Sequence, residues 1–327
     1  MTAANATGRP VSAGGTGLAG PEVAVAAFLH RWGMVPEGEV RDRLLRTGIG
    51  GSVARCFPAA DADGKRIITE AFTWFTAFDD LHEPGTGPEA ADTAAAIAGL
   101  VAVLDLDGAG ESPAGCGTGQ GAAVAAFAAV SAELRRRLTP AQFGRLADAV
   151  RGYLLAVLWE HSARDVRAAD YLAMRRHLSF ARLLPPLLEW TTGRELPAGL
   201  HDAPVTRRLL TEFCDVVLIH NDLVSFTWEQ AHRGRAEDLS NLITITARDT
   251  GRPNAEAAAV VRTMLDTALD RYRVRRAAVA VGAPQAGAYL GALDDFLAGL
   301  LSNGLPGRYG TGPAPRAPLS DDDGRHA

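Results

Sequence analysis

The sequence predicts an all-α fold, a single domain of roughly ten helices. Apolar residues recur at intervals of three and four through most of the chain, as they do on one face of a helix. Alanine, leucine and arginine dominate these stretches, and the apolar-polar alternation that is typical of strands is missing. Hydrophobic residues make up 47% of the 327 residues, so the chain can bury a sizeable core.

Six segments carry the helical pattern most clearly, and we expect each to form a helix: residues 23–32, 66–78, 121–138, 140–163, 206–231 and 255–281. The Gly-rich run at 108–121 has some features of a phosphate-binding loop. It follows no buried strand and lacks the Gly-Lys-Ser/Thr ending, so we interpret it as an ordinary loop.

The two ends of the chain have a different composition from the middle. Residues 1–20 are rich in glycine, alanine and threonine, and residues 311–327 are similar, so both are predicted to be disordered. The acidic run at 321–323 lies in the second of these tails, where charge runs are usually solvated and bind nothing. We therefore expect one folded domain over residues 21–310.

Composition and cysteine usage exclude several classes of function. A net charge of −5 and a pI near 5.9 do not favour a nucleic-acid partner, which normally requires a basic excess. Cys56, Cys116 and Cys214 are far apart and odd in number, which argues against a disulfide framework or a CxxC metal site. The chain shows neither a secretory signal nor an apolar run of about 18 residues. We expect a cytoplasmic protein without a membrane span.

A first acidic motif, DDLHE at residues 79–83, follows the predicted helix at 66–78. Asp79 and Glu83 are four residues apart and would share a helix face, with Asp80 beside them. A hard divalent cation such as Mg2+ would relieve the repulsion among the three carboxylates. Phe72 and Phe75 precede Asp79 on about the same face and would line the space next to the metal. The alternative is an ordinary solvated helix end.

A second motif lies inside the apolar helix predicted at 206–231. Asn221, Ser225 and Glu229 follow one another at intervals of four, and together they form a stripe of oxygen-bearing side chains. So apolar a helix is expected to be buried, and polar side chains on a buried helix need partners. Two helices with oxygen stripes would provide such partners by facing each other across a metal cluster.

The two motifs resemble those of class I terpene synthases. The stretch from Asn221 to Glu229 matches their (N/D)D(L/I/V)x(S/T)xxxE pattern, and residues 79–83 match their DDxx(D/E) pattern. In that family an arginine lies about 46 residues before the second motif, and Arg175 is 46 residues before Asn221. An Arg-Tyr pair is expected about 80 residues after it, and Arg308 and Tyr309 lie 79 and 80 residues beyond Glu229. The resemblance covers roughly residues 20 to 310.

The resemblance implies a helical bundle around a central apolar cavity, with the metal site at its mouth. The implied activity is that of a terpene cyclase, a carbon-oxygen lyase that ionises an isoprenyl diphosphate, cyclises the carbocation and releases diphosphate. Farnesyl diphosphate is the first expectation for the substrate and geranylgeranyl diphosphate the second. A homodimer is usual in such proteins.

The resemblance also implies Mg2+ as the cofactor, with three ions expected and Mn2+ as a substitute. The metal ligands that it implies are Asp79, which bridges two ions, Asp80, Glu83, Asn221, Ser225 and Glu229.

The resemblance implies a diphosphate-binding set and a cavity lining as well. Arg175 and Arg308 would grip diphosphate oxygens, Tyr309 would donate a hydrogen bond, and with Asp79 these form the catalytic set. Aromatic faces can stabilise the carbocation. The expected cavity residues are Phe72, Phe75, Leu178, Ser179 and Phe180.

Three positions depart from the family pattern. Trp228 stands where a lysine or arginine usually contacts the diphosphate, so that Arg176, Arg182 or another arginine would have to supply the charge. Leu178 stands where an aspartate or threonine usually follows Arg175, and it cannot accept a hydrogen bond. Ser302 stands where many bacterial members have a cavity tryptophan, which keeps a longer C20 substrate open.

Other functions remain as alternatives. A prenyl-elongating synthase would need a second aspartate-rich motif in place of residues 221–229. A class II cyclase would need DxDD, but residues 105–108 read DLDG. A helical binding protein that has lost the chemistry is the non-enzymatic alternative. Among the other polar residues, His82 is expected to be exposed and not a ligand, and His177 and His220 to be structural.

Overall fold

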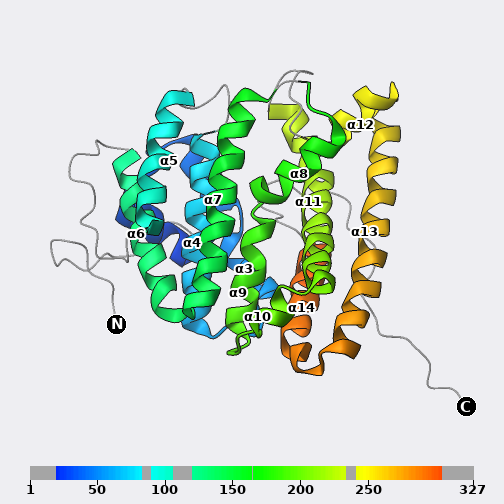
Figure 1. Cartoon of the computed structure of the whole chain (residues 1–327). Coiled ribbons are helices and arrows are strands. Elements are labelled where there is room, and N and C mark those ends of the chain that lie inside the picture. Colours follow the sequence, from blue (N-terminus) through cyan, green and yellow to red (C-terminus); the bar gives the residue numbers. More distant parts are fainter. Residues whose placement is uncertain (1–19, 83–89, 106–119, 164, 233–240, 304–327) are drawn as a thin grey trace, which may run out of the picture.

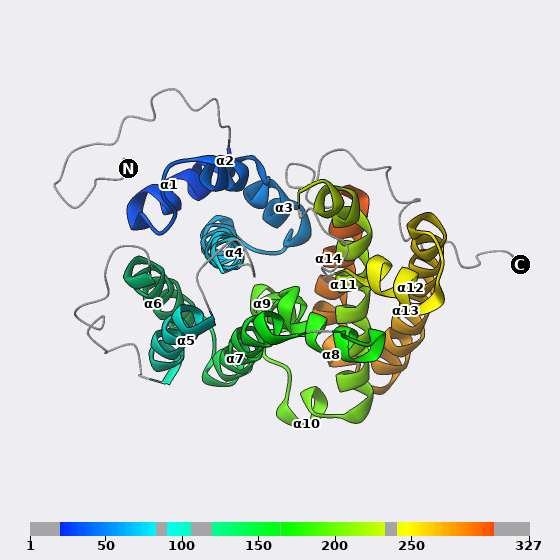
Figure 2. The same ribbon diagram turned by 90° about the horizontal axis from the view of Figure 1, so that it is seen from above.

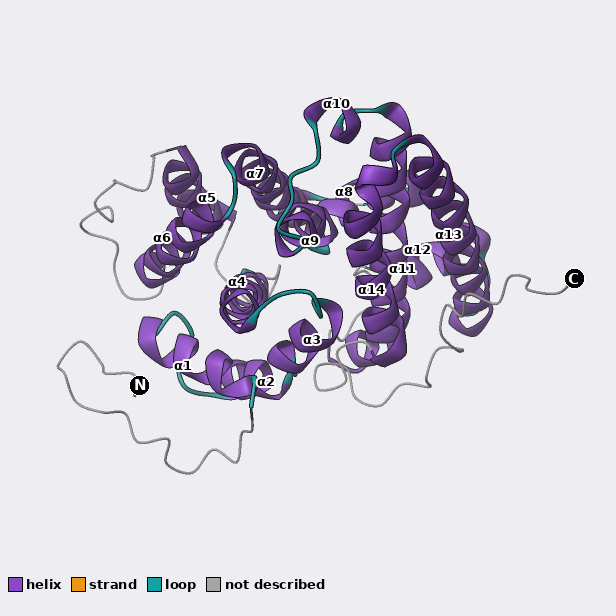
Figure 3. Ribbon diagram, turned by 90° about the horizontal axis from the view of Figure 1, so that it is seen from below, coloured by secondary structure: helices purple, strands orange, loops and turns teal. Residues whose placement is uncertain are grey.

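The computed structural model describes residues 20–82, 90–105, 120–163, 165–232 and 241–303, and all the regular structure in these ranges is helical. The predicted fold class is therefore confirmed (Figure 3). The expected disordered segments, the acidic run at 321–323, Cys116 and most of the Gly-rich run lie outside the described residues. None of the described helices combines the length and apolar character needed to cross a membrane.

Along the chain the described helices are α1 (Glu22–Trp32), α2 (Glu39–Arg46), α3 (Ile49–Cys56), α4 (Ala62–Leu81), α5 (Ala90–Asp105), α6 (Gln120–Arg137), α7 (Pro140–Ser162), α8 (Ala168–Leu178), α9 (Leu184–Thr191), α10 (Ala198–His201), α11 (Pro204–His232), α12 (Leu242–Thr250), α13 (Asn254–Gly282) and α14 (Gly287–Asn303). Short 3-10 turns, η1 (Ala181–Leu183) and η2 (Pro284–Ala286), precede α9 and α14. All six predicted segments are helices.

Helix α4 occupies the interior of one half of the molecule. It begins at Ala62 because the side chain of Asp61 accepts a hydrogen bond from the amide of Gly64 at 2.6 Å and caps its first turn. It contacts α1, α3 and α6 and lies between the α1–α3 segment and the α5–α6 pair (Figure 2). Most of its residues are buried, so its last turn, at Asp79 and Asp80, projects from a packed core.

Helix α11 organises the other half. It runs beside α13 in the opposite direction, and it also contacts α8, α12 and α14 (Figure 1). The apolar residues before the second motif, such as Phe213 and Leu218, are fully buried. This burial confirms the expectation that the motif lies on a core helix.

The chain breaks its helical path between α8 and α9. Helix α8 ends at Leu178, and Phe180 has φ 62° and ψ 1°, a left-handed conformation that costs a non-glycine residue about 1–2 kcal/mol. The 3-10 turn η1 then leads into α9. This break sets the phenylalanine ring against α4 and α7, as described below.

Candidate active site

The first motif lies in the last turn of α4. Asp79 is half-buried, and the hydroxyl of Tyr153 in α7 is 3.5 Å from its Oδ1, a long hydrogen bond. The Asp80 side chain is only 4% exposed, and its Oδ2 lies 3.0 Å from Nη2 of Arg43 in α2. Burial, followed by the charge of Asp79, raises the pKa of Tyr153 well above its usual value, so this phenol stays protonated.

Aromatic rings gather beside Asp79. The rings of Phe75, Tyr153 and Phe180 contact one another, with centroid distances of 5.4 Å, 5.6 Å and 5.2 Å. Phe72 packs instead against Phe57 of α3 at 6.2 Å. The expected cavity residues Phe75 and Phe180 are therefore brought together, and Tyr153 joins them without having been predicted.

The remaining expected cavity positions lie at the end of α8. Leu178 is buried, and the hydroxyl of Ser179 is buried without a hydrogen-bond partner among the described residues. Ser302 lies exposed near the end of α14, where its hydroxyl donates to the carbonyl of Gly299 at 3.0 Å.

The second motif lies along α11 as predicted. Oδ1 of Asn221 accepts a hydrogen bond from Nη2 of Arg175 at 2.8 Å, so the 46-residue spacing corresponds to a contact. Oε2 of Glu229 accepts from the side-chain amide of Asn241 at 2.9 Å. Ser225 between them is fully buried, and its hydroxyl has no hydrogen-bond partner within the described ranges.

Asp222, the second residue of the motif, connects α11 to neighbouring helices. Its fully buried carboxylate accepts hydrogen bonds from Nε of Arg175 at 2.9 Å, the hydroxyl of Tyr171 at 2.7 Å and the amide of Leu242 at 2.9 Å. Asn241 also donates to the carbonyl of Asp222 at 2.9 Å, so α8 and the start of α12 are both tied to α11. Burial raises the pKa of Asp222, and Arg175 acts against that rise.

Sequence reasoning missed Asp222, Tyr171 and Asn241. Asp222 was visible inside the motif, but its role depends on donors from two other helices. Asn241 carried a weaker signal, since it precedes an apolar helix and caps it, accepting from the amide of Ile243 at 2.9 Å.

The donor set fits a hard divalent cation. The candidate ligand side chains of the two motifs all offer oxygen, which Mg2+ prefers, and the buried hydroxyl of Ser225 is an acceptor still open to a ligand. Within the described ranges no three histidine, cysteine, aspartate or glutamate side chains converge as a metal site, and the second motif contributes Asn221 and Ser225, which lie outside those four residue types. Glu83, Arg308 and Tyr309, which belong to the predicted set, lie outside the described residues.

The expectation that His82 is exposed is wrong. Its ring is 5% exposed and stacks on the ring of Phe78 at 3.9 Å, and its Nδ1 donates to the carbonyl of Phe78 at 2.8 Å. Burial lowers the pKa of this imidazole. His220 is buried as well, and burial lowers its pKa to about 4, which agrees with the structural role expected for it.

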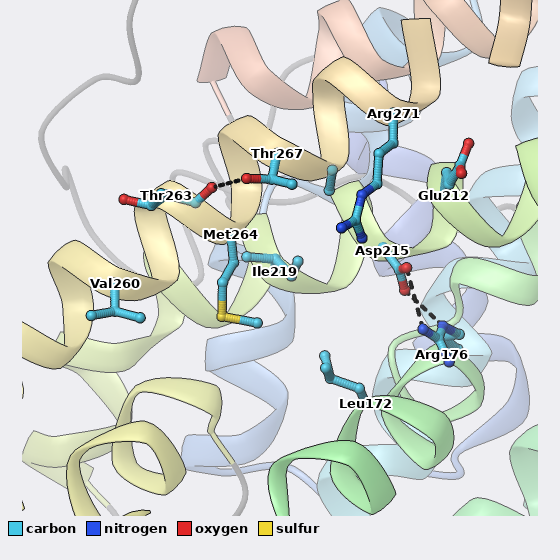
Figure 4. A pocket seen from close by; sticks show the side chains of 11 residues that line it. Leu172, Arg176, Glu212, Asp215, Ile219, Val260, Thr263, Met264, Thr267 and Arg271 are labelled. Carbon is cyan, nitrogen blue, oxygen red and sulfur yellow. Dashed lines mark hydrogen bonds and ion pairs between the residues drawn. The ribbon is translucent and has the colours of Figure 1, made fainter. Parts of the chain in front are cut away.

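A groove between α8, α11 and α13 lies on a different side of α11 from the motif (Figure 4). Arg176 and Asp215 form an ion pair on its wall, with 2.6 Å between Nε and Oδ1. Ile219 and Met264 give the groove part of its apolar lining. None of the predicted site residues lines it.

Comparison with known proteins finds relatives over most of the chain. The family model described as terpene synthase family 2, C-terminal metal binding, matches residues 70–271. A labda-7,13(16),14-triene synthase of Streptomyces clavuligerus is 33% identical over 238 residues, 71% of this chain and 66% of the relative. A 4-epi-cubebol synthase of Streptosporangium roseum, which cyclises (2E,6E)-farnesyl diphosphate, is 27% identical over 282 residues, 83% of this chain and 81% of the relative.

Solved structures share the fold. A linalool/nerolidol synthase from Streptomyces clavuligerus in complex with 2-fluorogeranyl diphosphate superposes with a TM-score of 0.71 at 21% identity, over 85% of this chain and 96% of that chain. Wild-type cucumene synthase superposes with a TM-score of 0.69 at 23% identity, over 87% and 94%. The chain spans 66%, 58% and 67% of the length of the three labdatriene synthases that it matches.

Proposed function

The chain belongs to the terpene synthase family, and on that premise we propose that it is a class I terpene cyclase. It ionises an isoprenyl diphosphate, cyclises the carbocation and releases diphosphate, which makes it a carbon-oxygen lyase. The observation that carries the proposal is the contact of Arg175 with Asn221 at 2.8 Å and with Asp222 at 2.9 Å. It holds a guanidinium, which binds phosphate oxygens well, beside the oxygen stripe of α11.

The metal in this proposal is Mg2+, with three ions and Mn2+ as a substitute. When bound, Mg2+ neutralises the negative charge that develops on the diphosphate as the carbon-oxygen bond breaks. The side chains proposed to hold it are Asp79, Asp80, Glu83, Asn221, Ser225 and Glu229. Arg175, Arg308 and Tyr309 are proposed to bind the diphosphate.

The ring cluster of Phe75, Tyr153 and Phe180 supports the second half of the reaction. These rings lie beside Asp79 and offer π faces and edges to a carbocation. The phenol of Tyr153 stays neutral because burial raises its pKa, so it does not present a phenolate that would capture the cation. Phe75 and Tyr153 are buried, and a buried lining would keep water from the reacting carbon.

The chain length of the substrate is C15 or C20. Farnesyl diphosphate is the first candidate, and the 4-epi-cubebol synthase of Streptosporangium roseum acts on that substrate. The C20 alternative has its own support, because the relative at 33% identity is a labdatriene synthase and labdane nomenclature denotes a bicyclic C20 skeleton. A C20 substrate is therefore offered both as linear geranylgeranyl diphosphate and as a preformed bicyclic labdane diphosphate.

The test is a product assay with purified full-length protein. Geranyl, farnesyl, geranylgeranyl and bicyclic labdane diphosphates are incubated separately with Mg2+ or with EDTA, and organic extracts are analysed by gas chromatography with mass detection. We expect one substrate to give a Mg2+-dependent hydrocarbon or alcohol. Asp79→Ala and Asn221→Ala should abolish it, whereas Asp215→Ala, on the groove side of α11, should retain it.

Recovery of all four diphosphates intact, from folded protein in Mg2+, would contradict the proposal. The non-catalytic alternative would then stand, and Trp228 and Leu178 would be its explanation. An elongated diphosphate formed only when isopentenyl diphosphate is added would instead identify a prenyl-elongating synthase.

A further inference from the structure

One arginine from the N-terminal part of the chain contacts both motif helices. Arg43 lies in α2, and its Nη2 is 3.0 Å from Oδ2 of Asp80 at the end of α4. Its guanidinium carbon also lies over the indole ring of Trp228 in α11, 5.4 Å from the ring centroid. A positive charge therefore stands between the aspartates of the first motif and the last turn of the second.

This guanidinium is held in position but keeps donors to spare. An arginine offers five N–H groups, and the ion pair with Asp80 and the face of Trp228 engage only part of them. Nε of Arg43 is buried and has no acceptor among the residues that the structure describes. The side chain as a whole is 24% exposed, so an anion can approach it.

Two arginines of α8, beside α11, are engaged by side chains of α11. Arg175 uses Nε and Nη2 for Asp222 and Asn221, and it is 13% exposed. Arg176 is paired with Asp215 in the groove toward α13, away from the motif (Figure 4). Trp228 itself carries no charge, and the guanidinium that lies over its ring is that of Arg43.

We propose that Arg43 binds the diphosphate of the substrate and supplies the positive charge that Trp228 does not. The inference rests on the proposed function, since it assumes that a diphosphate binds between the two motifs. Asp80 holds the guanidinium in the absence of substrate. The diphosphate accepts hydrogen bonds from the remaining N–H groups of the same guanidinium, while the ring of Trp228 holds that guanidinium between the two motifs.

The test compares Arg43→Gln with Arg46→Gln, which removes an exposed arginine from the last turn of the same helix. The dissociation constant of inorganic diphosphate is measured by calorimetry in Mg2+, together with KM and kcat for the accepted substrate. We expect Arg43→Gln to weaken diphosphate binding and to raise KM by about tenfold, the scale of one charge-assisted hydrogen bond. Arg46→Gln should match the wild type.

A second variant separates binding of the ligand from support of the fold. Trp228→Arg, made in the Arg43→Gln background, puts a guanidinium back between the two motifs and should restore most of the affinity for diphosphate. The melting temperature without metal or ligand monitors loss of the contact with Asp80.

Three outcomes overturn the inference, and they differ in what else they affect. If Arg43→Gln binds diphosphate like Arg46→Gln while the wild type makes product, Arg43 has no part in binding and the proposed function stands. If affinity and melting temperature fall together and Trp228→Arg restores neither, Arg43 only supports the fold. If the wild type neither binds diphosphate in Mg2+ nor makes product, the proposed function fails as well.

Discussion

The end of α4 and the middle of α11 both carry oxygen-bearing motifs, but their surroundings differ. On α11 the side chains of Asn221 and Glu229 each accept a hydrogen bond within 2.9 Å, and buried Asp222 accepts three. On α4 the described contacts of Asp79 include one hydrogen bond at 3.5 Å, from Tyr153. The α11 motif is thus fixed by donors from α8 and from the start of α12, whereas the hydroxyl of Tyr153 reaches Asp79 only over a long hydrogen bond.

Because of this difference, we expect substitutions at the two motifs to affect different properties, stability in one case and turnover in the other. A fully satisfied buried network is rigid, and losing one member leaves the other groups unpaired in a medium of low dielectric constant. A hydrogen bond as long as that from Tyr153 to Asp79 is weak, so its loss costs little free energy of unfolding. Substitutions behind the α11 motif should therefore affect folding, and substitutions at the tip of α4 should affect turnover.

The largest effect is expected for Asp79→Ala, and it should appear in activity. Removing this carboxylate should lower kcat by more than about 10,000-fold, because charge compensation at the leaving group is worth several kcal/mol. The hydrogen bond from Tyr153 is long, so its loss should contribute little to any change in the melting temperature. Product analysis and thermal unfolding measure the two quantities. A large loss of stability would remove the contrast between the two motifs.

The next largest effect is expected for Asp222→Ala, and it should appear in the free energy of unfolding. The variant leaves Arg175 and Tyr171 without their buried acceptor, and breaking such a pair costs about 4 kcal/mol. Denaturant titration measures the loss. Asp215→Ala is the control, because its ion pair with Arg176 is partly exposed and should cost less than about 1 kcal/mol. Equal losses would contradict the special role of Asp222.

Acid should weaken the α11 side through His220. Burial lowers the pKa of His220 from 6.5 to about 4, so the unfolded chain takes up a proton below pH 6.5 that the folded chain refuses. The stability present at neutral pH is therefore lost as the pH falls from 6.5 toward 4. The loss between pH 7 and pH 4 amounts to about 3 kcal/mol for this one group.

Unfolding free energies at pH 7 and pH 4 test this expectation. His220→Gln should show a smaller loss than the wild type by about 3 kcal/mol. His30→Gln, at an exposed position of α1, should show the wild-type loss, because changes in the carboxylates are common to all three proteins. A loss in His220→Gln as large as that of the wild type would assign the acid sensitivity to other groups.

The smallest effect is expected for Tyr153→Phe. The hydroxyl bonds Asp79 at 3.5 Å, so its removal should cost less than about 1 kcal/mol. Tyr171→Phe is the matched comparison on the α11 side, since that hydroxyl bonds buried Asp222 at 2.7 Å and its loss should cost about 2 kcal/mol. Denaturant titration of both variants measures the two losses in free energy of unfolding. A larger cost at Tyr153 would reverse the comparison.

The sequence predicted what depends on local pattern. The long helices follow from apolar spacing, and the spacing within the second motif places Asn221, Ser225 and Glu229 along α11. The role of Arg175 as a diphosphate ligand was expected from the resemblance, whereas its contact with Asn221 was not predicted.

The remaining features depend on contacts between distant residues. Arg43 and Trp228 are separated by 185 positions, and no local sequence pattern around either residue predicts their contact. In the sequence Tyr153 is one of several large residues in the segment of α7, and its contact with Asp79 arises only in the fold. His82 was expected to be exposed because its neighbours are acidic, whereas the ring of Phe78 decides its burial.

Because Trp228 lies between the two motifs, ligand binding there should be observable by fluorescence. Indole emission responds to nearby charge, and this ring lies under the guanidinium of Arg43. Trp74, by contrast, is fully buried, stacks on Phe78 and donates its indole N–H to the carbonyl of Ala123 at 2.8 Å. Mg2+ and diphosphate should therefore change the fluorescence of the protein through Trp228 while Trp74 stays constant. A chain with phenylalanine at position 228 would not show that change, which makes this residue a built-in optical reporter of occupancy.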